Sequence, residues 1–202
     1  MISEKSKAFN SFWTFFIQYN ILFLLYNHWN TIMSSKKTLI LNKEQIKQKS
    51  IRIAYQILED NFEDETLVLV GIADRGYVFA KRLQAILQDI SNKEILLIKV
   101  TMKKTSRSLS ASTDLPVDIA KDKTIILVDD VLNSGRALAY GLGVFLNVPL
   151  KKMRTAVLID RSHHKFPIFS DYYGTKLSTI LREHVTVTLE EFDKEEDAAW
   201  LI

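Results

Sequence analysis

The sequence contains no cysteine among its 202 residues. This absence excludes a disulfide framework, a thiol nucleophile and a cysteine-based zinc site. It fits a reducing compartment, and we therefore expect the protein to be cytoplasmic. The net charge is only +3, which is too small to indicate nucleic-acid binding by itself.

Larger sequence patterns are missing as well. The motif Gly-x-Gly-x-x-Gly does not occur, so nothing supports a generic dinucleotide-binding fold. We find no internal repeat and no low-complexity tract. What is present is the composition of an ordinary globular protein, with 47% hydrophobic and 25% charged residues. The length suits one domain with a substantial buried core.

The first 32 residues differ from the rest of the chain. Residues 12–26 are strongly apolar and aromatic, but the run is shorter than the roughly 20 residues needed to cross a bilayer. No small-residue cleavage site of a signal peptide follows it. Met33 begins a polar segment that looks like a natural protein start. We therefore expect residues 1–32 to be an extension upstream of the native protein, with residues 33–202 as the functional domain. A membrane-surface anchor is the alternative for the extension, but we expect no membrane partner.

Hydrophobic periodicity predicts strands that alternate with helices. Asn42 begins a capping box, and apolar residues then recur at helical spacing. The predicted helices cover 43–61, 79–90 and 136–146, the predicted buried strands cover 67–72, 95–100, 124–128 and 154–159, and 185–189 is predicted as an edge or hairpin strand. Residues 101–118 lack clear periodicity and are predicted as a long loop. This order favours an α/β fold with a mainly parallel sheet and helices on both faces.

The richest stretch of chemistry follows the strand predicted at 124–128. Asp129 and Asp130 stand at its expected end, and a polar turn with Gly135 leads into the helix that begins at Arg136. Ligands of open α/β sheets bind at the carboxyl ends of strands. A helix N-terminus offers free backbone N–H groups to an anion. The stretch therefore combines an anion cradle with two acids, which suits a sugar phosphate.

A second strand end, at 71–76, carries Arg75 and Gly76 in a polar turn before a helix. Its arginine and its amides suit a phosphate, although an ordinary strand-to-helix turn explains this stretch equally well when it is taken alone.

The acid pair at 129–130 has an alternative interpretation, because paired acids also occur in response-regulator receiver domains. There they follow the first strand near the start of the domain, whereas two predicted strands precede Asp129 here.

Together these stretches resemble the type I phosphoribosyltransferases. The family signature is an apolar strand, two acids, an apolar pair and a Ser/Thr-Gly turn, and the sequence DDVLNSGR at 129–136 fits it. The turn at 71–76 looks like the pyrophosphate loop of the family. Over about 39–189 the chain resembles the pyrimidine-operon attenuators that have uracil phosphoribosyltransferase activity. The resemblance implies the type I phosphoribosyltransferase fold, with a mainly parallel sheet flanked by helices, a small hood and a flexible lid loop.

The resemblance implies transfer of the 5-phosphoribosyl group from phosphoribosyl pyrophosphate to a nucleobase, a pyrimidine such as uracil, with release of pyrophosphate. Asp129 and Asp130 would be catalytic, because carboxylates stabilise the positive charge that develops on the ribose. They would also hold Mg²⁺, mainly through the substrate. The residues implied to bind phosphoribosyl pyrophosphate are Asp129, Asp130, Val131, Leu132, Asn133, Ser134, Gly135, Arg136 and Ala137, and those of the pyrophosphate loop are Ala73, Asp74, Arg75 and Gly76.

The resemblance also assigns the lid and the base site. The predicted loop 101–118 corresponds to the lid, in which Lys103 or Lys104 would replace an arginine as a catalytic pyrophosphate contact. A solvated basic loop is the alternative. Base recognition would fall to the residues after the strand predicted at 154–159 and to a turn at 171–174, namely Asp160, Arg161, Tyr172 and Tyr173. The ring of Tyr173 would either stack on the base or close the pocket.

The alternative function is that of a catalytically weak nucleotide-sensing regulator that binds RNA or a protein partner. Arg52 matches a residue of the RNA-binding face of the attenuators. However, Ile51 and Tyr55 replace the polar residues beside it and look more like a packing or dimer strip. We therefore expect RNA binding to be the weaker alternative. A homodimer or a higher homo-oligomer is expected.

Overall fold

The computed structural model describes residues 37–104, 109–162, 164–178 and 183–202. Residues 38–202 form one compact unit. The prediction for residues 1–32 lies outside the described residues. Among the described helices, none has the length and apolar character needed to cross a membrane.

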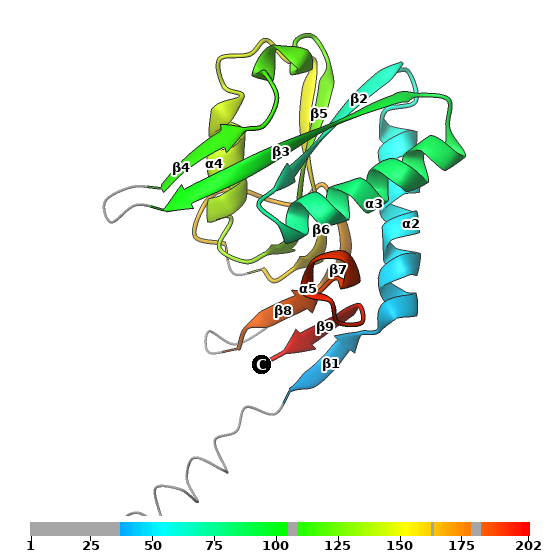
Figure 1. Ribbon diagram of the computed structural model, residues 1–202, viewed down its shortest axis with the longest axis vertical. Helices are drawn as coiled ribbons and strands as arrows, with labels where there is room; N and C mark the ends of the chain where they lie inside the picture. Colours follow the sequence, from blue (N-terminus) through cyan, green and yellow to red (C-terminus); the bar gives the residue numbers. More distant parts are fainter. Residues whose placement is uncertain (1–36, 105–108, 163, 179–182) are drawn as a thin grey trace, which may run out of the picture. The chain divides into compact units, whose positions relative to one another are not determined.

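The main sheet has six strands in the order β4-β3-β2-β5-β6-β7 (Figure 1). All neighbouring strands are parallel except β4, which is antiparallel to β3. The strands are β2 Thr66–Ile72, β3 Glu94–Lys104, β4 Leu109–Thr113, β5 Thr124–Leu132, β6 Lys152–Asp160 and β7 Tyr172–Lys176. The prediction of a mainly parallel α/β sheet is therefore confirmed.

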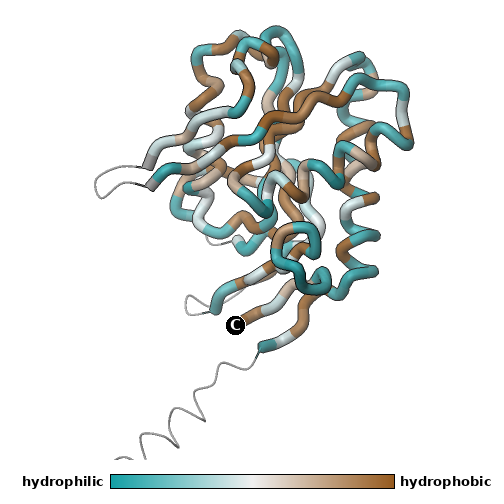
Figure 2. The backbone as a smooth tube through the Cα atoms, in the orientation of Figure 1, coloured by the Kyte–Doolittle hydropathy of each residue, from teal (hydrophilic) through white to brown (hydrophobic). Residues whose placement is uncertain are grey.

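Helices cover both faces of this sheet (Figure 1). Helices α2 (Lys43–Asp60) and α3 (Arg75–Ile90) pack on one face, and α4 (Arg136–Val144) packs on the other. Residues of β2 alternate between the two cores: Leu67 and Leu69 meet the first pair of helices, whereas Val68 and Val70 belong to the core that contains α4. Burial on both faces explains why these strands read as continuous apolar runs. Figure 2 shows hydrophobic residues concentrated along the crossing strands of the sheet.

Helix α2 forms where its sequence signals place it. The side chain of Asn42 accepts a hydrogen bond from the Gln45 amide at 2.9 Å, and Gln45 Oε1 accepts one from the Asn42 amide at 2.9 Å. These two bonds are the predicted capping box. The apolar side chains Ile46, Ile53 and Ile57 are fully buried against the sheet. The helix ends at Asp60, one residue before the predicted end.

A second sheet joins the beginning and the end of the described chain. It has three antiparallel strands in the order β1-β9-β8, formed by Thr38–Leu41, Ala198–Leu201 and Val185–Thr188. Strand β8 covers the edge strand predicted at 185–189. We call these strands, together with the short helix α5 (Glu190–Asp193), the hood. Strands β1 and β9 have only four residues each, too few for a clear periodic pattern.

The prediction of a loop at 101–118 is wrong for most of that range. Strand β3 continues to Lys104 and pairs with β4 in an antiparallel arm, and a 3₁₀ helix follows at Val117–Ala120. Residues 105–108, between the two strands, lie outside the described residues. The arm consists mainly of Thr, Ser and Lys, and only side chains such as Met102 and Ala111 pack against the core. Backbone pairing thus forms strands that have too little apolar alternation to be recognised in the sequence.

Candidate active site

Asp129 and Asp130 lie inside β5, not after its end as predicted. The strand continues to Leu132 because its backbone keeps pairing with β6: Asp129 lies opposite Val157, and Val131 lies opposite Ile159. Backbone pairing does not depend on side-chain polarity, so the two acids do not end the strand. The side chain of Leu132 is buried in the core, which leaves only its backbone for a ligand.

The two carboxyl groups are buried next to each other, so their ionised forms are disfavoured. Burial raises the pKa of Asp129 well above its usual range, and the neighbouring charge of Asp130 raises it further. Burial also raises the pKa of Asp130, although a hydrogen bond with Asp129 and the positive charge of Arg75 oppose the increase. Two crowded acids with raised pKa values favour a cationic ligand or a cationic transition state.

The acid pair supplies oxygen donors of the kind that Mg²⁺ prefers. Within the described residues, no group of three or more acidic or histidine side chains is arranged to hold a metal. Two carboxylates of raised pKa fit a magnesium ion that takes its remaining ligands from a bound substrate. The donor set therefore fits the predicted Mg²⁺, which Asp129 and Asp130 would hold mainly through the substrate.

The turn after β5 leads directly into the nine-residue helix α4. Gly135, the N-cap, adopts a left-handed conformation with φ of 77°, which glycine tolerates without strain. The amides of Lys165 and Phe166 both donate to the carbonyl of Ser134, at 2.9 and 3.0 Å. The amide of Arg136 donates to Ser134 Oγ at 3.3 Å. These bonds fix a turn whose helix N-terminus offers amides to an anion.

The second turn, at residues 73–76, lies at the carboxyl end of β2. Ala73 has a positive φ of 53°, an uncommon conformation for a residue with a side chain, and its amide donates to the Val100 carbonyl at 2.8 Å. Asp74 forms an ion pair with Lys99 at 2.8 Å. Arg75 begins α3 and forms an ion pair with Asp193 of the hood. Neither ion pair was predicted from the sequence.

Gly76 joins the two turns. A Cβ atom at this position would lie 2.9 Å from Asp129 Oδ1, 2.9 Å from the Val128 carbonyl oxygen and 3.0 Å from Asp129 Cα. Real Cβ atoms do not approach backbone atoms this closely. The absence of a side chain therefore allows the start of α3 to pack directly against the acid pair. The structure thus brings the predicted pyrophosphate loop and the predicted catalytic acids together.

The predicted lid lysines lie on the antiparallel arm. Val100 lies opposite Ile72, the last residue of β2, so Lys103 lies about 10 Å past the end of that strand, at about 3.3 Å per residue. Lys103 is exposed and makes no ion pair with any residue that the structure describes. Lys104 lies opposite Leu109 in the arm. The structure thus places Lys103 on the arm, without an ion pair to Asp129 or Asp130.

The predicted base-site residues Asp160 and Arg161 are both buried and both serve internal bonds. Asp160 accepts hydrogen bonds from the Ser162 amide, His164 Nε2 and Ser170 Oγ at 3.0, 2.9 and 2.7 Å. Although burial acts to raise its pKa, these bonds hold the pKa of Asp160 below its usual range. Arg161 donates to Asn133 Oδ1 at 2.7 Å and thereby ties this segment to the turn before α4.

The turn predicted at 171–174 is wrong, because Tyr172 begins strand β7. Tyr172 is only 6% exposed, packs in the core with α2, and donates its hydroxyl hydrogen to Asp60 at 2.6 Å. Its ring is therefore committed to the core, so a contact of this residue with a base would use its backbone. Tyr173 is half-buried on the other face, and the ammonium of Lys176 lies 4.4 Å from its ring centroid. Lys176 also lies 3.9 Å from Asp160 and was not predicted as a site residue.

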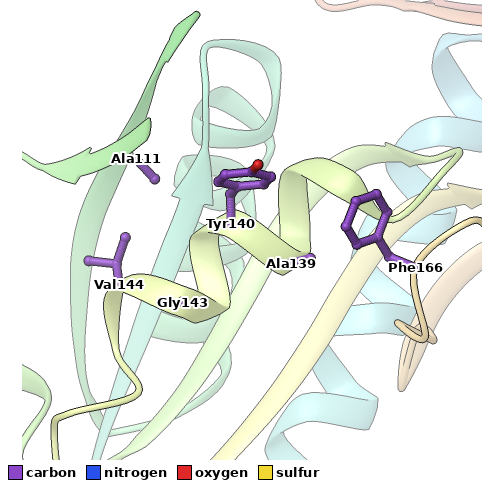
Figure 3. A pocket seen from close by; sticks show the side chains of 6 residues that line it. All are labelled: Ala111, Ala139, Tyr140, Gly143, Val144 and Phe166. Carbon is purple, nitrogen blue, oxygen red and sulfur yellow. The ribbon is translucent and has the colours of Figure 1, made fainter. Parts of the chain in front are cut away.

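A separate hollow of about 420 Å³ lies between β4 and α4 (Figure 3). Its described lining residues are Ala111, Ala139, Tyr140, Gly143, Val144 and Phe166. None of these carries a charge, and Asp129 and Asp130 are not among them. The described lining of the hollow thus lacks the groups that a sugar phosphate requires. The candidate site is defined by the acid pair and the two turns.

Comparison with known families gives a match over most of the chain. Residues 38–191 match the family model described as the phosphoribosyl transferase domain. A protein of Pelotomaculum thermopropionicum named bifunctional protein PyrR is 36% identical over 173 residues, which cover 81% of this chain and 95% of that protein. The protein of the same name from Bacillus subtilis is 36% identical over 171 residues, covering 79% and 94%.

Solved structures share the fold. A hypoxanthine-guanine phosphoribosyltransferase from Bacillus anthracis aligns with a TM-score of 0.64 and 21% identity, covering 81% of this chain and 97% of that one. The hypoxanthine phosphoribosyltransferase of Trypanosoma cruzi in complex with the product IMP aligns with a TM-score of 0.69 and 17% identity, covering 83% and 94%. At these identities the likeness concerns the fold alone.

The variant Asp129→Asn should be more stable than the parent protein at pH 7. Its parent carboxyl has a raised pKa in the folded state, so ionisation weakens the fold once the pH exceeds the unfolded pKa of about 3.9. Each unit of elevation corresponds to about 1.4 kcal/mol. Thermal melts at pH 4 and pH 7 should show a higher Tm for the variant at pH 7 and a smaller difference at pH 4. An unchanged Tm at pH 7 would contradict the raised pKa of Asp129 in the folded state.

The variant Gly76→Ala should displace the start of α3 from Asp129 and destabilise the protein by about 1–3 kcal/mol. The matched control is Gly143→Ala in α4, where a Cβ atom meets nothing within 4 Å. That change should be neutral or stabilising by up to about 1 kcal/mol, because alanine is the better helix former. Denaturant unfolding measures the free energy of unfolding of both variants. Equal values for the two would refute the close approach of Gly76 to Asp129.

Proposed function

Because this chain belongs to the phosphoribosyltransferase family, we propose that it transfers the 5-phosphoribosyl group of phosphoribosyl pyrophosphate to a nucleobase and releases pyrophosphate. The observation that carries this proposal is the close approach at Gly76, which sets the loop 73–76 beside Asp129 and Asp130. The turn into α4 follows the same strand. A cation-stabilising pair thus stands between two loops suited to phosphate groups.

In this proposal the 5-phosphate binds the turn formed by residues 133–137. The amides at the start of α4 donate to its oxygens, and Ser134 adds its hydroxyl. The turn is held in place before the substrate arrives, through the bonds of the Ser134 carbonyl to the amides of Lys165 and Phe166. A preorganised turn loses little conformational entropy on binding. This end of the substrate would therefore be anchored firmly.

The acid pair acts on the ribose. Asp129 and Asp130 accept hydrogen bonds from its 2- and 3-hydroxyl groups. As the bond between C1 and the pyrophosphate oxygen breaks, the ribose gains positive charge, and the carboxylates stabilise that charge more strongly than the neutral ground state. The two carboxylates would hold Mg²⁺, mainly through the substrate, and the ion would supply charge neutralisation for the leaving pyrophosphate. The loop of Ala73, Asp74, Arg75 and Gly76 faces that leaving group.

The base we propose is a pyrimidine, with uracil as the first choice. Two relatives with 36% identity are named bifunctional protein PyrR, and the sequence resembles the attenuators with uracil phosphoribosyltransferase activity. Tyr173 is half-buried, and the ammonium of Lys176 lies 4.4 Å from its ring centroid and 3.9 Å from Asp160. Because Asp160 is engaged in internal hydrogen bonds, we assign the contacts with the base to Lys176 and backbone groups.

Regulation of RNA is the second candidate, and the word bifunctional in the names of the relatives favours it. Arg52, the residue that matches the RNA face of the attenuators, donates to the carbonyls of Tyr173 and Gly174 at 2.7 and 2.6 Å. This use of its guanidinium favours a structural role. A gel shift with the native upstream leader at physiological salt tests RNA binding, because weak non-specific binding is lost there. A homo-oligomer and a cytoplasmic location stay predictions.

A panel of bases tests the proposed reaction. With phosphoribosyl pyrophosphate and Mg²⁺, we expect uracil to give the highest kcat/KM, at least about tenfold above hypoxanthine or guanine, because one tenfold step needs only about 1.4 kcal/mol. The variants Asp129→Asn and Asp130→Asn should lose at least about 100-fold in turnover while staying folded. Nucleotide binding without turnover of any base would favour the regulator instead.

The variant Lys103→Ala should lower kcat, whereas Lys103→Arg should retain most of it, if the arm brings a cation to the pyrophosphate. We expect a loss of about tenfold or more, since one charge-assisted contact is worth about 1.5–3 kcal/mol. Lys121→Ala, which removes an exposed lysine outside the arm, is the matched control. Equal kinetics for Lys103→Ala and Lys121→Ala would assign Lys103 to a solvated surface.

A further inference from the structure

Helix α3 carries two arginines that bind the hood. Arg75 is its first residue and Arg82 follows seven residues later, so both lie on the same side of the helix. Arg75 pairs with Asp193, and Arg82 pairs with Glu191 and Asp197. All three acids belong to the segment 190–197, which begins with α5. The pyrophosphate-loop helix and the hood are thus joined by two arginine clamps.

The clamp at Arg75 is a fork with fixed geometry. Nε and Nη2 of Arg75 donate to the two carboxylate oxygens of Asp193, at 3.0 and 2.5 Å. Asp193 is itself held, because its Oδ2 accepts the Leu189 amide at 2.8 Å and its side chain is only 12% exposed. The ring centroid of Phe192 lies 5.4 Å from the guanidinium carbon. Asp193 therefore offers a rigid support on which the planar group of Arg75 is held.

The other side of Arg75 belongs to the active site. Arg75 is part of the predicted pyrophosphate loop and precedes Gly76, the residue that touches Asp129. The hydrogen bond with Asp193 raises the pKa of Arg75 most, and the charges of Asp130 and Asp74 raise it further, so Arg75 lies within electrostatic reach of the acid pair. Its Nη1 takes no part in the fork with Asp193. The side chain of Arg75 is 37% exposed, which leaves room for a ligand.

We propose that Asp193 of the hood is a positioning residue, which holds the guanidinium of Arg75 by two of its nitrogens so that the third is presented to the pyrophosphate group of phosphoribosyl pyrophosphate. This inference rests on the function proposed above and assigns the hood a part in substrate binding. A free arginine loses side-chain entropy when it binds a ligand, whereas an arginine already held in a fork loses less. Asp193 thereby increases the affinity for pyrophosphate without touching it.

The second clamp provides a closely matched control. Asp197 also accepts hydrogen bonds from an arginine of α3, and it also accepts a backbone amide, that of Glu190, at 2.9 Å. Its side chain is 7% exposed, comparable to that of Asp193. However, Arg82 lies two helical turns away from the pyrophosphate loop. Loss of Asp197 should therefore weaken the hood to a similar degree without changing the orientation of Arg75.

The test compares Asp193→Asn with Asp197→Asn in the full-length protein. Asp193→Asn should raise the KM for phosphoribosyl pyrophosphate, and the Kd for inorganic pyrophosphate with Mg²⁺ measured by calorimetry, by about tenfold, with kcat changed less than about twofold. Asp197→Asn should leave both constants unchanged, although its Tm falls. In an Arg75→Ala background, Asp193→Asn should have no further effect on either constant, because the residue that it positions is gone.

Several outcomes would overturn the inference. Equal shifts in KM for Asp193→Asn and Asp197→Asn would show that both acids act only through the stability of the hood. If the parent protein binds pyrophosphate and Asp193→Asn binds it equally well, the positioning role fails while the proposed function stands. If the parent protein binds neither pyrophosphate nor phosphoribosyl pyrophosphate, both proposals fail together.

Where Asp193→Asn does not fold, Arg75→Lys takes its place. Lysine keeps the charge but cannot form the planar fork with a carboxylate. The same rise in KM of about tenfold is expected, and Arg82→Lys on the second clamp is the control that should not show it. An unchanged KM for Arg75→Lys would overturn the role of the fork.

Discussion

The close packing of α3 on the sheet is the constraint on which the rest of the site depends. It requires two glycines. A Cβ atom at Gly71 would lie 2.5 Å from the Cα of Tyr77, and one at Gly76 would lie within 3.0 Å of three atoms of β5. With side chains at these positions the helix would move outward, and Arg75 would move with it. The distance between the loop 73–76 and the acid pair is therefore set by the absence of two side chains.

Most acids of the site and the hood have a close donor or cation, whereas Asp129 and Asp130 have no close cationic partner among the described residues. Asp160, Asp193 and Asp197 are each satisfied by donors, and hydrogen bonds hold their pKa values below the usual range even though burial opposes this. Asp129 and Asp130 show the opposite shift. The protein thus tolerates an electrostatic cost at one place. In the proposed function, the positive charge that develops on the substrate offsets this cost, and the site trades stability for function.

The sequence predicted those parts of the fold whose signals are local. Strands β2 and β5, buried on both faces, appear as apolar runs, and the capping box at Asn42 marks the start of α2. Strand β4 and the hood strands β1 and β9 were missed, because their pairing is determined by distant backbone partners and not by their own periodicity. The fork between Arg75 and Asp193 joins residues 118 positions apart, and no spacing rule in a single sequence connects them. The acidic segment 190–197 reads only as a solvated charge run until the fold places it on α3.

The predicted base-site residues show why residue type alone is not enough to assign a role. Asp160 and Tyr172 suit a base by their chemistry, yet the structure commits both to internal bonds, with Ser170 and with Asp60 respectively. Alternation along β7 then decides which ring faces away from α2: Tyr172 packs with that helix, so Tyr173 lies on the opposite face. The half-exposed Lys176 places its ammonium 4.4 Å from the ring centroid of Tyr173 and 3.9 Å from Asp160. In the proposed function this ammonium is the donor to an exocyclic oxygen of the base.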